Sequence, residues 1–157
     1  MLYNEDAFNA TKNASYQYGQ FFRAVADELG LDKAMKLHVE AYKLYGADAE
    51  SMLKEAYGEK INLKAMAEFL DETLRAGGWE LQMVEESPKS YLFKHTKCPE
   101  CEGLFMAGLD AETVEAHCRK SVETVTPYLR KLVPGVKLGV RKWDAPAYCE
   151  EELLLEK

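Results

Sequence analysis

The sequence contains no long apolar run. No stretch approaches the roughly 18 apolar residues that a membrane-spanning helix requires, and no repeat or low-complexity segment interrupts it. Its start, MLYNEDAFNATKN, has acidic residues where a secretory signal would carry basic ones. We therefore expect no membrane partner and a cytoplasmic protein, whose cysteines are thiols or metal ligands instead of disulfide partners.

Blocks of positive charge are also missing. The 20 lysines and arginines are outnumbered by 27 acidic residues, which gives a net charge of −7. A surface of that sign repels phosphate backbones, so we expect no nucleic-acid partner. The glycine-rich phosphate-binding motifs and the G-x-S-x-G nucleophile motif do not occur, which leaves NTPase, dinucleotide-binding and serine hydrolase functions without support.

The first half of the sequence has helical periodicity. Apolar residues recur three or four positions apart, Gly30 and Gly46 stand where helices would stop, and Asp48 and Asn62 are suitable N-caps. These signals predict four helices, at residues 15–30, 31–46, 48–60 and 62–78.

After Gly78 the apolar period changes from about 3.6 to 2, which indicates strands. Residues 79–96 alternate and turn at a Ser-Pro pair, which predicts a hairpin. A helix is expected over 111–132, with Asp110 as its cap, and a second strand pair over 136–156.

The order of helices, hairpin, helix and hairpin predicts an α+β fold with an antiparallel sheet packed against helices. A length of 157 residues fits one domain, so we expect a single α+β domain over 1–157, with loose order expected only within 1–14. The charged run EEELLLE at 150–156 is interpreted as an exposed edge strand.

The segment HTKCPECEG contains two of the four cysteines at Cys-x2-Cys spacing. This spacing lets one turn present two thiolates to a zinc ion. The other two cysteines lie in the predicted helix 111–132 and the last strand, which can reach the same end of the sheet. His95 or His117 could replace one thiolate. The predicted zinc ligands are Cys98, Cys101, Cys118 and Cys149.

Other interpretations of the cysteines stay open at this stage. An iron–sulfur cluster would use the same four thiolates, and the Cys-Pro-x-Cys turn would suit disulfide exchange if it opened a helix within a βαβ unit. Cys118 and Cys149 could also fill the core as small apolar residues. His38, beside Leu37 on a predicted helix, is interpreted as a helix-surface histidine.

Five segments together, spanning roughly residues 15–155, resemble a known family: ADELGLDKAMKLHVEAYKLYG, RAGGW, HTKCPECEG, HCRK and AYC. The chain is similar to proteins related to L-2-amino-thiazoline-4-carboxylate hydrolase, which opens a cyclic thiazoline to an N-carbamoyl-cysteine. The resemblance implies a cysteine-rich site that also includes His117. The order of elements is also similar to the small-molecule-binding domain related to vinyl reductases, and this resemblance implies zinc bound by such cysteines.

Two functions follow as expectations. As an enzyme, the protein would use a metal-polarised water to hydrolyse a small heterocycle, with His117, Glu100 or Asp110 relaying a proton. As a non-enzymatic module, it would hold a structural zinc and bind or sense a small molecule in an apolar pocket. A homodimer is a further expectation. The residues predicted to line that pocket are Phe21, Phe22, Trp79, Tyr91 and Phe93. The alternative is that these aromatic side chains only pack in the hydrophobic core.

Overall fold

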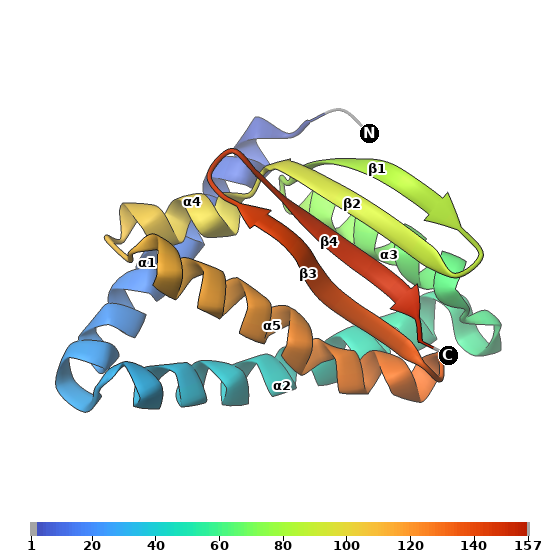
Figure 1. The fold of residues 1–157 in the computed structure, drawn as a ribbon, viewed down its shortest axis with the longest axis horizontal. Helices are drawn as coiled ribbons and strands as arrows, with labels where there is room; N and C mark the ends of the chain where they lie inside the picture. The colour runs from blue at the N-terminus through green and yellow to red at the C-terminus, as the bar shows by residue number, and fades with distance from the viewer. Residues whose placement is uncertain (1–2, 157) are drawn as a thin grey trace.

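A computed structural model describes residues 3–156 of the protein. It contains five α-helices, a short 3-10 turn and four strands (Figure 1). In chain order these are α1 (Glu5–Leu29), α2 (Leu31–Tyr57), η1 (Gly58–Lys60), α3 (Leu63–Ala76), β1 (Glu80–Ser87), β2 (Ser90–Lys97), α4 (Pro99–Met106), α5 (Ala111–Leu132), β3 (Val136–Asp144) and β4 (Tyr148–Leu155).

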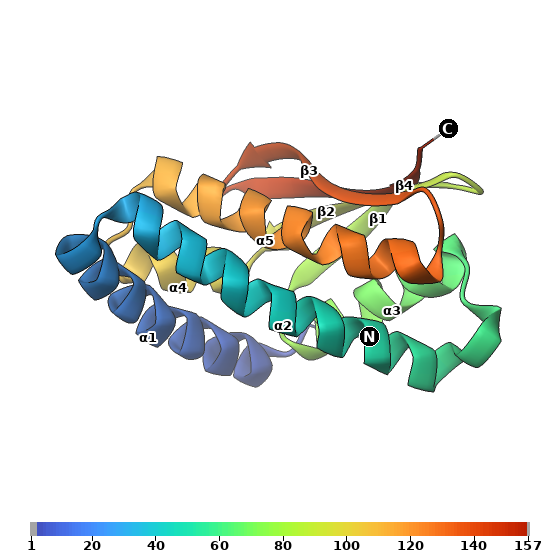
Figure 2. The same cartoon turned by 90° about the horizontal axis from the view of Figure 1, so that it is seen from below.

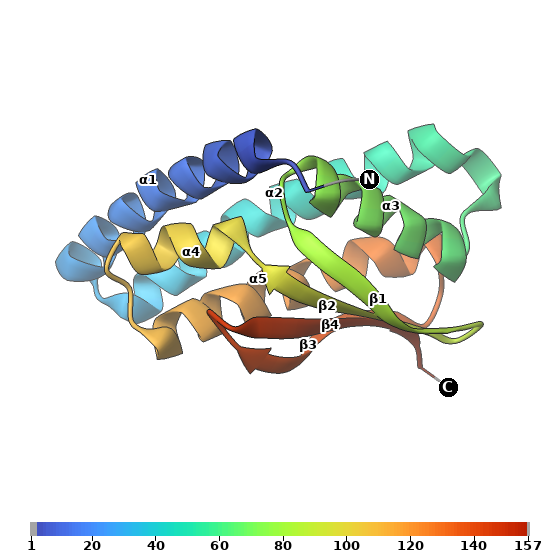
Figure 3. The same ribbon diagram turned by 90° about the horizontal axis from the view of Figure 1, so that it is seen from above.

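The four strands form one antiparallel sheet in the order β1-β2-β4-β3. Each hairpin contributes one edge strand and one central strand, and β2 pairs with β4 between them. All helices lie on one side of the sheet, with α5 next to it and α1 and α2 farther away (Figures 2 and 3). The predicted α+β architecture is therefore confirmed.

The core fills the space between the sheet and the helices. Its fully buried members come from both layers: Leu53, Met66, Phe93, Leu129 and Leu153 are each at most 2% exposed. Alternation along the strands sends these side chains to the helical face, while the opposite face carries charged residues such as Glu85, which pairs with Arg141. None of the helices in the described part of the chain combines the length and apolar character needed to cross a bilayer.

Three helix boundaries differ from prediction. The helices expected at 31–46 and 48–60 are one helix, α2, so Asp48 is not a cap. Gly46 does not stop the helix; it makes room for the ring of Tyr128, which would lie 2.5 Å from an added Cβ. Helix α1 begins at Glu5, so most of the segment 1–14 is helical, with Asn4 as its cap.

Helix α4 was not predicted. Gly103 inside the segment and Gly108 just after it disfavour a helix at 99–106, but Gly103 lies against the backbone of Lys12 in α1, where no side chain would fit. Pro99 occupies the first turn, where its missing N–H costs nothing. The close contact between α4 and α1 thus outweighs the weak local propensity.

Two further interpretations are wrong. The run at 150–156 belongs to β4, which is a central strand and not an edge. His38 is 2% exposed and lies inside the helical layer, not on its surface. In both cases the polar residues of the sequence suggested an exposed position, whereas the tertiary structure places them inside the fold.

Candidate functional site

A cavity of about 340 Å³ lies between the helices and the inner face of the sheet. This volume falls within the range of roughly 300–1,000 Å³ that is typical of small-molecule sites. All five helices and strands β2, β3 and β4 contribute to its wall. The cavity has an apolar end and a polar end, which differ in the chemistry they offer.

The apolar end lies where α2, α3 and α5 approach one another. Its wall is formed by aliphatic and aromatic side chains of these helices, of strand β3 and of the loop before β1, and no charged group interrupts it among the described residues. These side chains include Leu53, Phe69, Leu70, Leu74, Trp79, Val122, Val125, Leu129 and Leu138.

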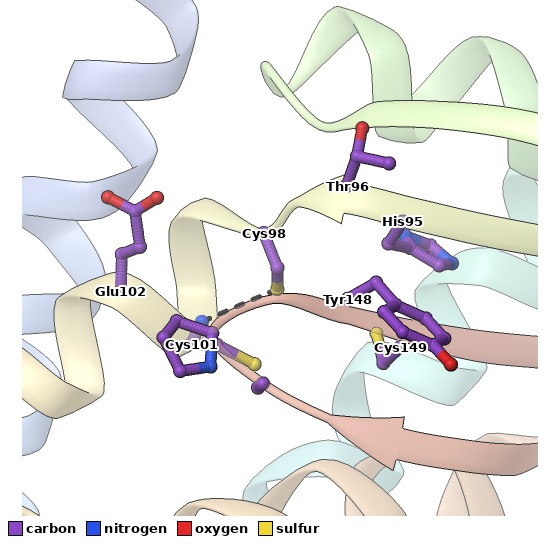
Figure 4. Close-up of a pocket in the computed structure, with 9 residues that line it drawn as sticks. His95, Thr96, Cys98, Cys101, Glu102, Tyr148 and Cys149 are labelled. Carbon is purple, nitrogen blue, oxygen red and sulfur yellow. Dashed lines mark hydrogen bonds between the residues drawn. The ribbon is translucent and has the colours of Figure 1, made fainter.

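The polar end contains all four cysteines. Cys98 is the N-cap of α4, and its Sγ accepts a hydrogen bond of 3.4 Å from the backbone N–H of Cys101 (Figure 4). Cys101 Sγ lies 3.4 Å from Cys118 Sγ of α5. Cys149, on β4, lines the same cavity. The fold therefore brings three distant segments to one wall. A second, water-sized hollow of about 10 Å³ lies against three of these cysteines and His95.

The cysteines are free thiols, and their surroundings keep them neutral. The hydrogen bond with Cys101 and burial raise the pKa of Cys98 well above its usual value. Hydrogen bonding to Cys118 raises the pKa of Cys101, and burial raises that of Cys149. Zinc binds thiolates, so neutral thiols must first lose protons.

The arrangement of these groups does not fit a metal ion. Among the side chains that the structure describes, no three histidine, cysteine, aspartate or glutamate residues are grouped so that they could hold one. The zinc ligand set expected from the sequence is therefore close together but not in a coordinating geometry.

Two glutamates share the polar end with the cysteines. Glu100, in the first turn of α4, accepts a hydrogen bond of 2.6 Å from the hydroxyl of Tyr42. Glu151 points inward from β4, and burial, together with the nearby charge of Glu100, raises its pKa to about 7. Its Oε2 lies 3.5 Å from Nε2 of His95.

His95 is buried at the same end without a hydrogen-bond partner. It is 3% exposed, and neither ring nitrogen makes a hydrogen bond within the described structure. Burial lowers its pKa to about 4, so the ring is neutral at neutral pH. Nε1 of Trp143, also on the cavity wall, is a further buried polar atom without a partner, and both ring nitrogens of His117, which lies off the wall, also have none.

A second group of buried polar side chains lies between the helices. The hydroxyl of Tyr18 is 2.8 Å from Nδ1 of His38, whose Nε2 is 3.0 Å from Oγ of Ser121. Ser121 donates to the backbone oxygen of His117 at 2.9 Å. Because the hydroxyl proton of Ser121 is donated to that backbone oxygen, Nε2 of His38 must donate its own proton to Oγ of Ser121. His38 therefore does not act as a base for the serine.

The predicted catalytic residues are not gathered in one place. Glu100 lines the cavity. His117 is 1% exposed and stacks on His38 with ring centroids 3.8 Å apart, but it is not part of the cavity wall. Asp110 is an exposed residue whose side chain caps α5 by accepting from Thr113 N at 2.7 Å, which explains its presence without catalysis.

The residues predicted to line the pocket also lie at different places in the structure. Trp79 lines the cavity. Phe21 is 66% exposed on α1 and faces away from it, because it lies next to the inward-facing Phe22, whose ring contacts His38 and His117. Phe93 is core, and Tyr91 lines a different groove near the start of β2.

Glu151, Trp143, Tyr42 and Ser121 were missed as cavity residues. For Glu151 a signal existed: the register that turns Leu153 inward also turns Glu151 and Cys149 inward. Tyr42 could have been found four residues after His38 on α2.

No family model, curated protein or solved structure matches the chain. The resemblance to the thiazoline hydrolase family therefore stays a prediction, and the site has to be interpreted from its own chemistry.

Proposed function

We propose that the protein binds a small, partly apolar molecule in the cavity between its helices and its sheet. The cavity itself is the observation that carries the proposal: about 340 Å³ of space between the helices and the sheet, in a region that a protein of this size ordinarily fills to close packing. Empty volume in a core costs stability, so its retention favours a role for the space.

The polar end supports the same proposal. Buried polar groups are normally hydrogen-bonded, yet His95 and Trp143 present nitrogens without partners at the cavity wall. A bound molecule can supply those partners. The combination of a large apolar surface and a few convergent polar groups is typical of small-molecule sites.

Hydrolysis of a small heterocycle is the second candidate. One observation favours it: Glu151 has a pKa of about 7 and faces the cavity, which suits a general base at neutral pH. Incubation with a thiazoline, followed by detection of the released thiol, would test it. Loss of that signal in Glu151→Gln, but not in Glu152→Gln, is the expected result if this candidate holds.

A cytoplasmic location belongs to the same proposal. Its support is that all four cysteines are free thiols, as in a reducing compartment. A zinc ion has no such support, because the cysteines are not grouped around a coordination point within the described residues.

Tryptophan fluorescence tests binding directly, because both tryptophans of the chain, Trp79 and Trp143, line the cavity. We expect a saturable change on titration with octanol. Ala49→Leu should fill part of the cavity and weaken the response, whereas Ala47→Leu, at an exposed position of the same helix, should leave it unchanged. Equal responses from both variants would show that the probe does not bind in the cavity.

A further inference from the structure

The polar end of the cavity has negative charge and no positive charge to balance it. Glu100 and Glu151 both line the wall, whereas no lysine or arginine does so among residues 3–156. Lys94 and Lys142, on the two strands that flank β4, instead lie against the ring of Tyr148, which projects from the opposite face of β4 to Cys149.

Of the two carboxylates, Glu151 has fewer hydrogen-bond partners. Glu100 has the hydroxyl of Tyr42 as a donor. Within the described structure, the side chain of Glu151 is 17% exposed and its only ion-pair neighbour is His95, a neutral imidazole whose geometry makes no hydrogen bond to it. A carboxylate removed from water normally has a cation beside it. The protein supplies none here.

His95 provides an independent indication that a ligand completes this end. Its ring is 3% exposed, lies on the cavity wall beside Glu151, and has two nitrogens without partners. Ligand groups that donate and accept hydrogen bonds would satisfy both the imidazole and the carboxylate.

We propose that the occupant is an organic cation, a protonated amine attached to an apolar group. This inference rests on the proposed function and specifies its ligand. The ammonium group would lie between Glu100 and Glu151, and the apolar group would extend toward Leu53 and Leu129 at the other end. Tyr45 and Trp143 add aromatic faces to the wall, which attract cations further.

The proposal disfavours anionic occupants. A carboxylate in this cavity would face two glutamates without any basic side chain to receive it. The 2-aminothiazoline carboxylate suggested by the family resemblance carries such a carboxylate, and the cavity wall has no lysine or arginine to pair with that group.

The test uses three molecules that share one chain and differ in charge: octylamine, octanol and octanoate. Each is titrated into the full-length protein at mildly alkaline pH with a chelator present, and tryptophan fluorescence gives the dissociation constant. A charged hydrogen bond makes a difference of roughly tenfold or more. We therefore expect octylamine to bind at least about tenfold more tightly than octanol, and octanoate to bind most weakly.

Glu151→Gln should reduce the preference for octylamine over octanol to less than about threefold while leaving octanol binding intact, since a glutamine keeps the shape but not the charge. Glu152→Gln is the matched control, because the side chain of Glu152 faces the other side of β4 and accepts from Ser90.

Each outcome decides one part of the account. Equal binding of octylamine and octanol, or tighter binding of octanoate, would overturn the cation proposal and leave small-molecule binding in place. Failure of all three molecules to bind the wild-type protein would overturn both. An unchanged preference in Glu151→Gln would also overturn the assigned role of Glu151.

Discussion

Two buried polar regions lie close together in this protein and differ in whether their polar groups form a connected chain of hydrogen bonds, although His117, which stacks on His38 in the first region, also has two unpartnered ring nitrogens. In the first, between the helices, Tyr18, His38 and Ser121 form a continuous chain of hydrogen bonds. In the second, at the end of the cavity, His95 is 3% exposed with both ring nitrogens unpartnered, and the half-buried Glu151 has no cation beside it within the described structure. A satisfied network needs nothing more and stabilises the fold, whereas an unsatisfied one costs stability until something binds.

The comparison also explains why the cavity is placed where it is. The satisfied network lies at the contact of α1, α2 and α5, where the helices pack closely. The unsatisfied one lies where α4 and α5 meet the sheet, and there the side chains leave open space. We infer that the first region is structural and the second is functional.

The largest expected effect is on the pH dependence of stability. Burial lowers the pKa of His38, His95 and His117 from 6.5 to about 4. Between about pH 4 and pH 6.5, the unfolded chain therefore binds three protons, one on each histidine, that the folded chain does not bind. Glu151 opposes them, because its pKa is raised from 4.5 to about 7 in the folded state and its proton is lost on unfolding.

The net uptake on unfolding is therefore about two protons between pH 4.5 and 6.5. The free energy of unfolding should fall as pH falls through this window, by roughly 2 to 3 kcal/mol per pH unit. Urea unfolding at several pH values measures this slope. A flat profile would mean that the histidines are already protonated, or already accessible, in the folded protein.

Replacement of His38 tests the satisfied region. His38→Leu removes the partner of the half-buried Tyr18 hydroxyl and of the buried Ser121 hydroxyl, so we expect a loss of about 2 kcal/mol. Chemical denaturation at neutral pH measures it. A loss below about 0.5 kcal/mol would show that the hydrogen-bond chain contributes little.

Replacement of His95 tests the unsatisfied region with the same substitution. Because neither ring nitrogen has a partner, His95→Leu removes a desolvation cost and no hydrogen bond. We expect a change between zero and about 1 kcal/mol of added stability. If His95→Leu is instead more destabilising than His38→Leu, the contrast between the two regions is wrong.

The smallest effect is expected from metal removal. Within residues 3–156 the cysteines are not arranged for coordination, so a chelator should shift the melting temperature by less than about 1 °C, with Cys98→Ser behaving like the wild type. Metal analysis of the purified protein accompanies the melt. A stoichiometric metal that is lost in Cys98→Ser would instead support the zinc site expected from the sequence.

Most of the fold could be predicted because periodicity reports which face of an element is buried. The change of period after Gly78 and the caps at Asn62 and Asp110 identified strands and helices correctly. Local signals failed where a distant contact decides the outcome. Gly46 lies inside α2 because it accommodates Tyr128, and Gly103 lies inside α4 because α1 approaches its backbone.

The candidate site was less predictable than the fold. The spacing of Cys98 and Cys101 identified its position. The cavity, however, depends on how the helices pack against the sheet, and no short sequence pattern encodes that packing. His38 and Glu151 look like surface residues in the sequence because both side chains are polar. Their burial depends on helix orientation and strand order, which follow only from the tertiary structure.

The most direct test of the central claim is the proton–nitrogen NMR spectrum of the indole groups during a titration with octylamine. The chain has two tryptophans, both on the cavity wall, and Nε1 of Trp143 is unpartnered. The account predicts that both indole signals shift and saturate together, with the Trp143 signal changing most. Unchanged indole signals at concentrations that saturate other sites would contradict a ligand-binding role for the cavity.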